Sequence, residues 1–385
     1  MSSKKLGLSY GEMGLIALKS MSTIGREVDE WLKKKNNKDE DFSYLIDITE
    51  SRFSNGEAKI QINESVRGKD IFILCDIGNY GCTYKMFGME NRMGPDEHFQ
   101  DIKRVISAIN GKSHRINVVM PLLYGSRQHR RKTRESLDCA MALHELQNMG
   151  INGIYTFDVH DPNVQNAIPL LSFENIYPTA EIVNALISTE NISKQELANN
   201  EMIIISPDTG AMDRAIYYSN VLRQDIGLYY KRRDYTKVVD GKNPIVEHKY
   251  IGRDVEGMDI LIVDDMIASG GSVLDIASEL KKKKANRIFC AVSFALFTEG
   301  PEKFNEYYEA GLIDKVYSTN LTYVPEEIIS QPWFHQVNLS NLVAKFLRRI
   351  NLDNSVSRLL DKTRGIKDIV SEEEKEAFSE EQEEA

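Results

Sequence analysis

DILIVDDMIASGGSVLDIASEL, residues 259–280, is the stretch that decides the fold. An apolar run at 260–263 leads into two adjacent aspartates, Asp264 and Asp265, and then into a Gly-Gly pair flanked by serines. Beyond the glycines, apolar residues recur at the spacing of a helix that faces a core, namely Val273, Ile276, Ala277 and Leu280. This order predicts a buried strand, a loop and a helix, with polar residues gathered where the strand ends.

The loop at 268–272 has the chemistry of an anion site. Ser272 is predicted as the N-cap of the helix, with Asp275 completing a capping box, so that free backbone N–H groups are presented at a positive helix end. Gly270 and Gly271 let a ligand approach without a Cβ clash. The loop therefore suits a phosphate monoester.

The adjacent aspartates suggest what the phosphate is attached to. Asp264 and Asp265 would repel a phosphate, whereas hydrogen bonds to sugar hydroxyls suit two carboxylates. A phosphate beside vicinal hydroxyls predicts a ribose phosphate. The alternative is an ordinary strand-to-helix turn with a solvated pair of aspartates.

Strand and helix patterns alternate along most of the chain. Eight apolar runs are typical of buried parallel strands, at 71–75, 116–122, 154–159, 202–206, 226–230, 260–263, 288–294 and 315–318. Helical patterns lie between several of them, at 135–149, 181–188, 213–224 and 273–284. The alternation predicts an α/β protein with mostly parallel sheets flanked by helices. A domain boundary is expected near 171–180, where Pro178 interrupts the pattern.

The composition bounds the class of protein. The chain has 385 residues, 42% hydrophobic and 28% charged, which is enough for one large or two ordinary domains. A formal net charge of -10 argues against a nucleic-acid partner, and no apolar run approaches the roughly 18 residues of a membrane span. The N-terminus lacks a signal-peptide pattern, and none of the four cysteines has C-x-x-C spacing, so a cytoplasmic protein with free thiols is expected.

Charged residues follow the predicted strands, at the edge where open α/β sheets bind ligands. In chain order, the strand ends lead to Asp76, to YGSRQHRRK, to Asp158 and His160, to PDTG at 207–210 and to Lys231-Arg232-Arg233. Carboxylates, a histidine, cations and glycines together predict a site for a metal-bound substrate with several phosphates. The polar run that follows, 234–250, is predicted to be a loop that closes over substrate.

These motifs, in this order, resemble those of the ribose-phosphate diphosphokinases, which have the type I phosphoribosyltransferase fold. IVDDMIASGGS resembles the phosphoribosyl-binding signature, RFSNGEAKIQINESVRGKDIFIL the N-terminal ATP-site segment, and YGSRQHRRKTRES the nucleotide loop. FDVH, SPDTGAMDRA and YYKRRD resemble the metal, diphosphate-loop and catalytic-loop motifs. TYVPEEI and NSVSRLL resemble the C-terminal return segment, so the resemblance extends from Arg52 to Leu360.

The resemblance implies an enzyme that transfers the diphosphoryl group of MgATP to the anomeric hydroxyl of ribose 5-phosphate, giving phosphoribosyl diphosphate and AMP. It implies Mg²⁺ as cofactor and self-association into a homo-oligomer, a hexamer built from dimers. It also implies two similar doubly wound domains. The ATP-side domain would span 1–172 with a return segment at 322–360, the ribose-phosphate domain 173–321, and an acidic tail 361–385.

Site residues follow from the same resemblance, position by position. Lys231 and Arg233 would be catalytic; Phe53, Asn55, Glu57, Arg127 and Gln128 would bind ATP; Asp264, Asp265, Ser269, Gly270, Gly271 and Ser272 would bind ribose 5-phosphate; Asp208, Thr209 and Gly210 would form the diphosphate loop; and His160 and Asp208 would bind the metal.

The chain departs from the family pattern at several positions. Asn55, His129 and Ala268 stand where the family has Asp, and Ala211 where it has Gly. The stretch 75–99 is also longer than its counterpart in the family. Two other interpretations therefore stay open. A phosphoribosyltransferase is opposed by the ATP-like segment, and a non-catalytic regulatory homologue is favoured by Ala268 and His129.

Overall fold

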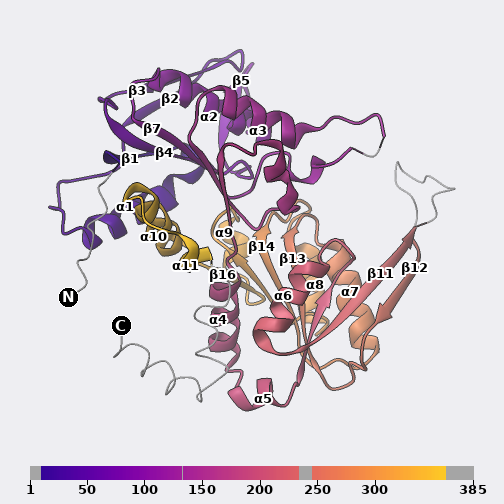
Figure 1. The fold of residues 1–385 in the computed structure, drawn as a ribbon. Helices are drawn as coiled ribbons and strands as arrows, with labels where there is room; N and C mark the ends of the chain where they lie inside the picture. The colour runs from indigo at the N-terminus through magenta and orange to yellow at the C-terminus, as the bar shows by residue number, and fades with distance from the viewer. Residues whose placement is uncertain (1–9, 132, 234–244, 361–385) are drawn as a thin grey trace, which may run out of the picture. The chain divides into compact units, whose positions relative to one another are not determined.

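The computed structural model describes residues 10–131, 133–233 and 245–360, and the chain divides into two compact units (Figure 1). Within those ranges, unit 1 comprises 10–178, 320–325 and 338–360, and unit 2 comprises 179–319 and 326–337. Each unit contains its own mostly parallel sheet and helices.

Unit 1 is built on a five-stranded sheet in the order β1-β4-β7-β8-β9, and every neighbouring pair is parallel. Its strands are β1 (Glu12–Ala17), β4 (Lys69–Leu74), β7 (Arg115–Val119), β8 (Gly153–Phe157) and β9 (Ser172–Ile176). β8 is buried along its whole length, as expected for a parallel strand covered on both faces.

Helices connect the strands of unit 1. They are α1 (Ser22–Lys35), α2 (Pro95–Ile109) and α3 (Asp138–Asn148), with the 3₁₀ segments η1 (Lys19–Met21), η2 (Ser126–Gln128) and η3 (Pro162–Ala167). α10 (Ser340–Asn351) returns from the C-terminal part of the chain and packs on α1, where Arg348 Nε donates to Asn36 Oδ1 at 2.9 Å. The short α11 (Ser357–Leu360) follows α10.

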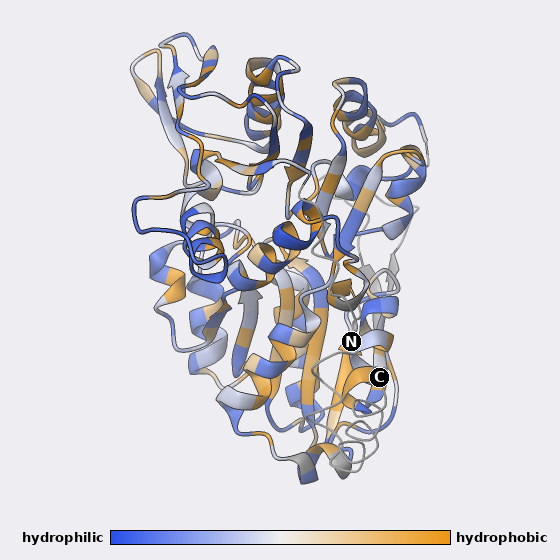
Figure 2. Cartoon of the chain, turned by 60° about the vertical axis from the view of Figure 1, so that its left-hand side comes forward, coloured by the Kyte–Doolittle hydropathy of each residue, from blue (hydrophilic) through white to orange (hydrophobic). Residues whose placement is uncertain are grey.

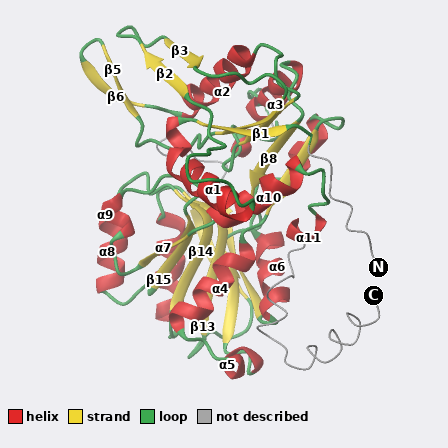
Figure 3. Ribbon diagram, turned by 90° about the vertical axis from the view of Figure 1, so that its left-hand side faces the viewer, coloured by secondary structure: helices red, strands yellow, loops and turns green. Residues whose placement is uncertain are grey.

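Two antiparallel hairpins also belong to unit 1, and they lie side by side in Figure 3. One is formed by β2 (Ile48–Arg52) and β3 (Ala58–Ile62), the other by β5 (Thr83–Met86) and β6 (Met89–Arg92). The second hairpin lies within the stretch 75–99.

Unit 2 contains a seven-stranded sheet in the order β12-β11-β10-β13-β14-β15-β16. Its strands are β10 (Met202–Ser206), β11 (Asp225–Arg233), β12 (Ile245–Ile251), β13 (Asp259–Ile267), β14 (Ile288–Ala295), β15 (Lys315–Thr319) and β16 (Phe334–Val337). All neighbours are parallel except β11 and β12. Its helices are α4 (Thr179–Glu190), α5 (Lys194–Ala198), α6 (Met212–Leu222), α7 (Gly271–Lys282), α8 (Glu302–Glu309) and α9 (Glu326–Ile329).

The core of unit 2 lies on its central strands. β10 and β14 are buried at every position, and the hydrophobic residues concentrate on the sheet in Figure 2. Phe297, Phe304 and Trp333 form an aromatic cluster of this core, with the Phe304 and Trp333 rings stacked at 5.1 Å. α8 carries Phe304, which packs against the glycine loop before α7, so this aromatic cluster supports the loop.

The predicted fold class, an α/β protein of two doubly wound domains, is confirmed. Each of the eight predicted strand runs coincides with a strand, and each of the four predicted helices with a helix. The strands predicted at 226–230 and 260–263 end too early: in the structure, β11 continues to Arg233 and β13 to Ile267. β12 overlaps the predicted closing loop at 234–250, so the loop interpretation is wrong from Ile245 onward. Residues 234–244 and the acidic tail 361–385 lie outside the described residues.

None of the helices in the described part of the chain combines the length and apolar character that crossing a membrane requires.

Candidate active site

The aspartate pair of unit 2 lies where two parallel strands separate. The sequence had suggested that Asp264 and Asp265 follow the strand. In the structure they belong to β13 itself. Pairing of β13 with β10 ends at Ile262, whereas pairing with β14 continues to Ile267. The side of β13 that faces β10 is therefore released just before the two aspartates. The strand end thus exposes polar groups at the point where α/β sheets bind ligands.

The two carboxyl groups differ in their surroundings. Asp265 is buried, and Asp264 retains about a quarter of its side-chain exposure, with Arg214 Nη1 3.8 Å from its Oδ1. Burial, and next the charge of Asp265, raise the pKa of Asp264. The backbone N–H of Asp265 also donates to Asp264 Oδ1 at 2.9 Å. Two neighbouring carboxyl groups that disfavour further negative charge are better suited to bind the neutral hydroxyl groups of a ligand than its phosphate.

The glycine loop is built differently from the predicted capping box. α7 begins at Gly271 with Gly270 as N-cap, and no side chain caps this end of the helix, so the assignment of Ser272 as N-cap is wrong. Gly270 has a φ of 86°, and a Cβ there would lie 2.3 Å from Phe304 Cε2. The chain therefore turns at Gly270, and the helix starts two residues earlier than expected. The first-turn amides from Gly271 onward have no side-chain cap, which is the arrangement that an anion site at a helix start requires.

The loop after β10 is organised by one carboxylate. Asp208 Oδ1 accepts the backbone N–H of Gly210 at 2.8 Å and that of Ala211 at 3.2 Å, and Ser206 Oγ donates to the Asp208 carbonyl at 2.6 Å. Asp208, Thr209 and Gly210 are all exposed. Because β10 is adjacent to β13, this loop and the aspartate pair lie at the carboxyl ends of neighbouring strands.

Lys231 and Arg233 were expected in a loop after the strand, but they belong to β11 itself. β12 pairs with β11 across this segment, with Lys231 opposite His248 and Arg233 opposite Ile245. A register shift falls between Arg232 and Arg233. The backbone of both predicted catalytic residues is thus part of a two-stranded extension at the edge of the sheet.

The predicted adenine-stacking residue lies at the tip of the β2–β3 hairpin. Phe53 is 50% exposed, so it is not a core residue. Its N–H donates to the Glu57 carbonyl at 2.8 Å, and Asn55 Nδ2 donates to Glu57 Oε2 at 2.9 Å. The three predicted base-binding residues therefore share one turn.

The other predicted ATP and metal residues of unit 1 lie at the carboxyl ends of the adjacent strands β7 and β8. Arg127 is exposed in η2, and Gln128 Nε2 donates to the Ser136 carbonyl at 2.9 Å. His160 is exposed, and its ring lies 5.4 Å from that of His129. The structure thus brings the nucleotide loop and the FDVH motif together.

Asp161 is a residue that the sequence reasoning missed. Its Oδ2 lies 3.3 Å from His129 Nε2, and its carboxylate also caps η3 through the N–H of Asn163. Its position directly after His160 at a strand end was the available signal. His129, at a position where the resemblance implies Asp, therefore lies beside the carboxylate of Asp161.

Asp76, which the sequence placed among the strand-end groups, holds the return segment. Its carboxylate accepts the N–H of Gly78 at 2.9 Å, the hydroxyl of Thr322 at 3.1 Å and the N–H of Tyr323 at 2.9 Å. Burial raises its pKa to about 7, although these three hydrogen bonds oppose the shift. Within unit 1 its observed contacts are therefore structural ones.

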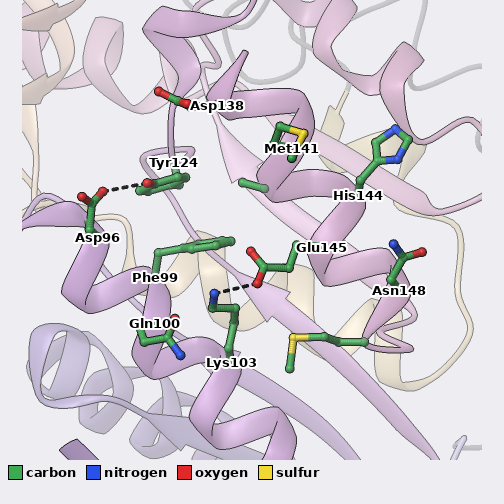
Figure 4. A pocket seen from close by; sticks show the side chains of 12 residues that line it. Asp96, Phe99, Gln100, Lys103, Tyr124, Asp138, Met141, His144, Glu145 and Asn148 are labelled. Carbon is green, nitrogen blue, oxygen red and sulfur yellow. Dashed lines mark hydrogen bonds and ion pairs between the residues drawn. The ribbon is translucent and has the colours of Figure 1, made fainter. Parts of the chain in front are cut away.

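A cavity of about 680 Å³ in unit 1 is separate from these groups. It lies between α2 and α3, where Figure 4 shows Phe99 stacked on Tyr124 and Lys103 paired with Glu145. None of the predicted site residues lines it. Among the described residues, no cluster of three or more His, Cys, Asp or Glu side chains is arranged to hold a metal ion.

The β13–glycine loop–α7 arrangement, with its aspartate pair and uncapped helix start, defines a protein of the type I phosphoribosyltransferase fold. Two family models match the chain: the N-terminal domain of ribose phosphate pyrophosphokinase over residues 13–150, and the phosphoribosyl transferase domain over residues 172–316. The chain belongs to the ribose-phosphate diphosphokinase (pyrophosphokinase) family.

Individual relatives agree with this assignment. The chain is 29% identical to a ribose-phosphate pyrophosphokinase of Vibrio cholerae over 322 residues, covering 82% of this chain and 92% of the relative. It is 28% identical to the enzyme of the same name from Buchnera aphidicola, covering 80% and 89%. The crystal structure of phosphoribosylpyrophosphate synthetase from Mycobacterium smegmatis has the same fold, with a TM-score of 0.71, 19% identity, and coverage of 89% of this chain and all of that one.

Proposed function

We propose that the protein is an active ribose-phosphate diphosphokinase. The anomeric hydroxyl oxygen of ribose 5-phosphate forms a bond to the β-phosphorus of ATP, and the bond from that phosphorus to the oxygen shared with the α-phosphorus breaks. AMP leaves with that oxygen, and the hydroxyl proton passes to solvent. The observation that carries the proposal is the end of β13, where Asp264 and Asp265 precede an uncapped helix start.

The ribose 5-phosphate site would use both features of that turn. The phosphate would accept hydrogen bonds from the amides at the start of α7 and from Ser269 and Ser272. Asp264 and Asp265 would accept the ribose hydroxyls, which the raised pKa of Asp264 favours over a second anion. Glycines at 270 and 271 keep side chains out of the approach.

Diphosphoryl transfer requires positioning and neutralisation of charge more than covalent participation by the protein. Lys231 and Arg233 would neutralise the charge that develops on the diphosphoryl group. The turn of Asp208, Thr209 and Gly210 would cradle the diphosphate of the product. The order of strands in unit 2 supports these roles. β10, which leads into the Asp208 turn, lies between β13, which carries the aspartate pair, and β11, which carries Lys231.

ATP would be bound by unit 1, with Phe53 stacking on adenine, Asn55 and Glu57 reading its edge, and Arg127 and Gln128 contacting the nucleotide. The 50% exposure of Phe53 supports this role, because its ring is free to meet a planar ligand. In the family these groups come from a neighbouring subunit. The proposal therefore includes a homo-oligomer, a hexamer built from dimers, as the working form.

Mg²⁺, bound to the ATP phosphates, would lower the charge that the attacking hydroxyl must approach. His160 and Asp208 would hold it. Asp208 fits such an ion, because Mg²⁺ is commonly held by one or two carboxylates together with phosphates and water, and Asp208 presents an exposed carboxylate. His160 is an atypical ligand, because Mg²⁺ prefers oxygen, and its assignment rests on the resemblance. Asp161, beside His160, is a second oxygen donor at the strand end.

Domain roles follow from these assignments. We assign ATP binding to the domain at 1–172 with its return segment, and ribose phosphate binding to the domain at 173–321. The four cysteines of the chain are free and buried, which suits a reducing compartment such as the cytoplasm.

One assay tests the function against both alternatives. Purified protein with ATP, Mg²⁺ and ribose 5-phosphate is expected to form AMP and phosphoribosyl diphosphate in equal amounts. A phosphoribosyltransferase would form neither product from these substrates. A regulatory homologue would bind ATP without forming AMP, and that result would reject the proposal. A preparation of Lys231→Ala purified in parallel controls for contaminating enzymes.

A further inference from the structure

The β5–β6 hairpin has an unusual residue at its tip. The two-residue turn between Met86 and Met89 consists of Phe87 and Gly88, with φ values of 49° and 78°. Such a turn favours Asn or Gly at its first position, because the left-handed conformation costs a residue with a Cβ about 1–2 kcal/mol. A bulky aromatic residue there works against the hairpin.

A second phenylalanine in the same conformation shows how that cost is normally offset. Phe297 has a φ of 44°, but it is only 2% exposed and packs against Phe304 at 5.1 Å. Phe87 is 73% exposed, and its ring makes no aromatic contact among the described residues. The aromatic packing that compensates Phe297 is not found around Phe87 in the described part of the chain. A ligand that covers the ring when bound would supply it.

The position of Phe87 indicates which ligand. Its N–H donates to the Ser54 carbonyl at 2.8 Å, which ties the tip of the β5–β6 hairpin to the turn that contains Phe53. A Cβ on Gly56, in the same turn, would lie 2.7 Å from Met86 Sδ. The tips of the two hairpins are thus in contact, and each carries an exposed phenylalanine, Phe53 or Phe87.

Both hairpins are also held by contacts with α2. Arg52, directly before Phe53, forms an ion pair with Asp101 of α2, and its guanidinium lies over the Tyr84 ring of β5 at 5.5 Å. The Tyr84 hydroxyl donates to Glu97, also of α2. The β5–β6 hairpin is therefore anchored to both α2 and the β2–β3 hairpin. A platform fixed in this way presents its aromatic rings with little loss of entropy on binding.

We propose that Phe87 is a second aromatic contact for the nucleotide base, which the β5–β6 hairpin adds to the contact that Phe53 provides. This inference rests on the proposed function. It assigns a role to the β5–β6 hairpin within the stretch 75–99, namely the recognition of a planar, uncharged ring system. Phe87 thereby sets affinity for the base of the diphosphoryl donor, and ribose 5-phosphate binding does not depend on it.

The test replaces Phe87 by Asn, which suits the left-handed turn and removes the ring. The hairpin of Phe87→Asn is expected to fold at least as well as the parent, so the melting temperature stays the same or rises. The KM for ATP is expected to rise about fivefold to tenfold, the lower part of the range for loss of one base-stacking aromatic. The KM for ribose 5-phosphate is expected to stay unchanged, and Phe87→Trp to restore the KM for ATP.

Two variants give the controls. Leu170→Ser removes a side chain that is 96% exposed elsewhere in unit 1 and should change neither KM. Phe53→Ser tests the proposed function separately: a raised KM for ATP in this variant together with an unchanged KM in Phe87→Asn overturns the inference and leaves the ATP site standing. An unchanged KM for ATP in Phe53→Ser overturns the proposed adenine site instead. A changed oligomer mass for Phe87→Asn, with its KM unaltered, assigns Phe87 to a subunit contact and rejects a role in base binding.

Discussion

Two adjacent glycines at the start of α7 allow the contribution of the loop to folding to be separated from its contribution to binding. Gly270→Ala places a Cβ on a residue with a φ of 86°, 2.3 Å from Phe304 Cε2 and 2.5 Å from Cζ. Gly271→Ala places a Cβ whose nearest neighbour is Ser269 Oγ at 3.9 Å, which is ordinary contact. The two substitutions add the same atom one residue apart and meet opposite surroundings.

The cost of Gly270→Ala follows from two terms. The left-handed conformation costs alanine about 1–2 kcal/mol. The clash adds about 1–3 kcal/mol, the usual range for overpacking a core. The Phe304 ring cannot move away freely, because it is stacked on Trp333 at 5.1 Å and meets Phe297 edge-on at 5.1 Å. The free energy of unfolding of unit 2 should therefore fall by about 2–5 kcal/mol.

Gly271→Ala should leave that free energy within about 0.5 kcal/mol of the parent, since alanine is favoured in a helix and meets open space. It should nevertheless raise the KM for ribose 5-phosphate about tenfold, because the methyl group occupies the approach to the amides that would bind the phosphate and weakens one charge-assisted hydrogen bond.

The measurement uses a tryptophan that reports on this cluster. The chain has two tryptophans, and Trp31→Phe leaves Trp333, next to Phe304, as the fluorescent probe of urea unfolding. A Gly270→Ala protein as stable as its parent would show that the tight contact with Phe304 is wrong. A Gly271→Ala enzyme with an unchanged KM for ribose 5-phosphate would refute the anion cradle.

Three further predictions address the chemistry and the return segment. Lys231→Ala should lower kcat at least about a hundredfold in steady-state assays, the scale for losing one group that stabilises transition-state charge, and near-normal turnover would remove Lys231 from the mechanism. His160→Ala should raise the Mg²⁺ concentration that gives half-maximal activity while the KM for ribose 5-phosphate stays the same; a superimposable Mg²⁺ titration would exclude His160 as a ligand. Asp76 has a folded-state pKa of about 7, above its usual value of 3.8, so the stability it contributes is present below about pH 4 and is lost as the pH rises through 7. In urea unfolding from pH 5 to 8, Asp76→Asn should remove this dependence, about 3 kcal/mol over that range, and equal pH profiles for the two proteins would contradict the raised pKa.

The success and failure of strand prediction follow one physical rule. The eight runs found from the sequence are the eight interior strands of the two sheets, which have a neighbour on each side and therefore carry continuous apolar segments. In the two larger sheets it missed β1, β9, β12 and β16, which are their four edge strands, and it also missed β2, β3, β5 and β6 of the two hairpins. An edge strand needs a less continuous apolar run: β9, for example, is only partly buried at most of its positions. The edge strand β1 does not follow this rule, because four of its six residues are buried. Continuous apolar runs thus locate the interior strands of a parallel sheet more readily than its edge strands.

The predicted ends of β11 and β13 were wrong for a different reason, which is that strand ends are set by pairing and not by polarity. The change from Val263 to Asp264 suggested the end of a strand, yet β13 continues because β14 still pairs with it. Likewise, the cationic Lys231 and Arg233 suggested a loop, yet β12 pairs with them. These residues do lie near the carboxyl ends of β11 and β13, as the sequence predicted. Their backbone state depended on neighbours far away in the sequence.

The unequal pairing of β10 and β13 explains how the aspartate pair can serve the proposed sugar site. If both strands ended together, Asp264 and Asp265 would lie in a loop, solvated and free to turn away from each other. Because β14 fixes the backbone of β13 through Ile267 while β10 stops pairing at Ile262, the two carboxyl groups are held on a rigid strand with one side open. The rise in the pKa of Asp264 is the electrostatic consequence of that restraint, since burial and the charge of Asp265 act on a group that cannot move away. Preorganisation of this kind stabilises a bound sugar without further ordering of the protein, and it is built from the pairing of strands before any ligand is present.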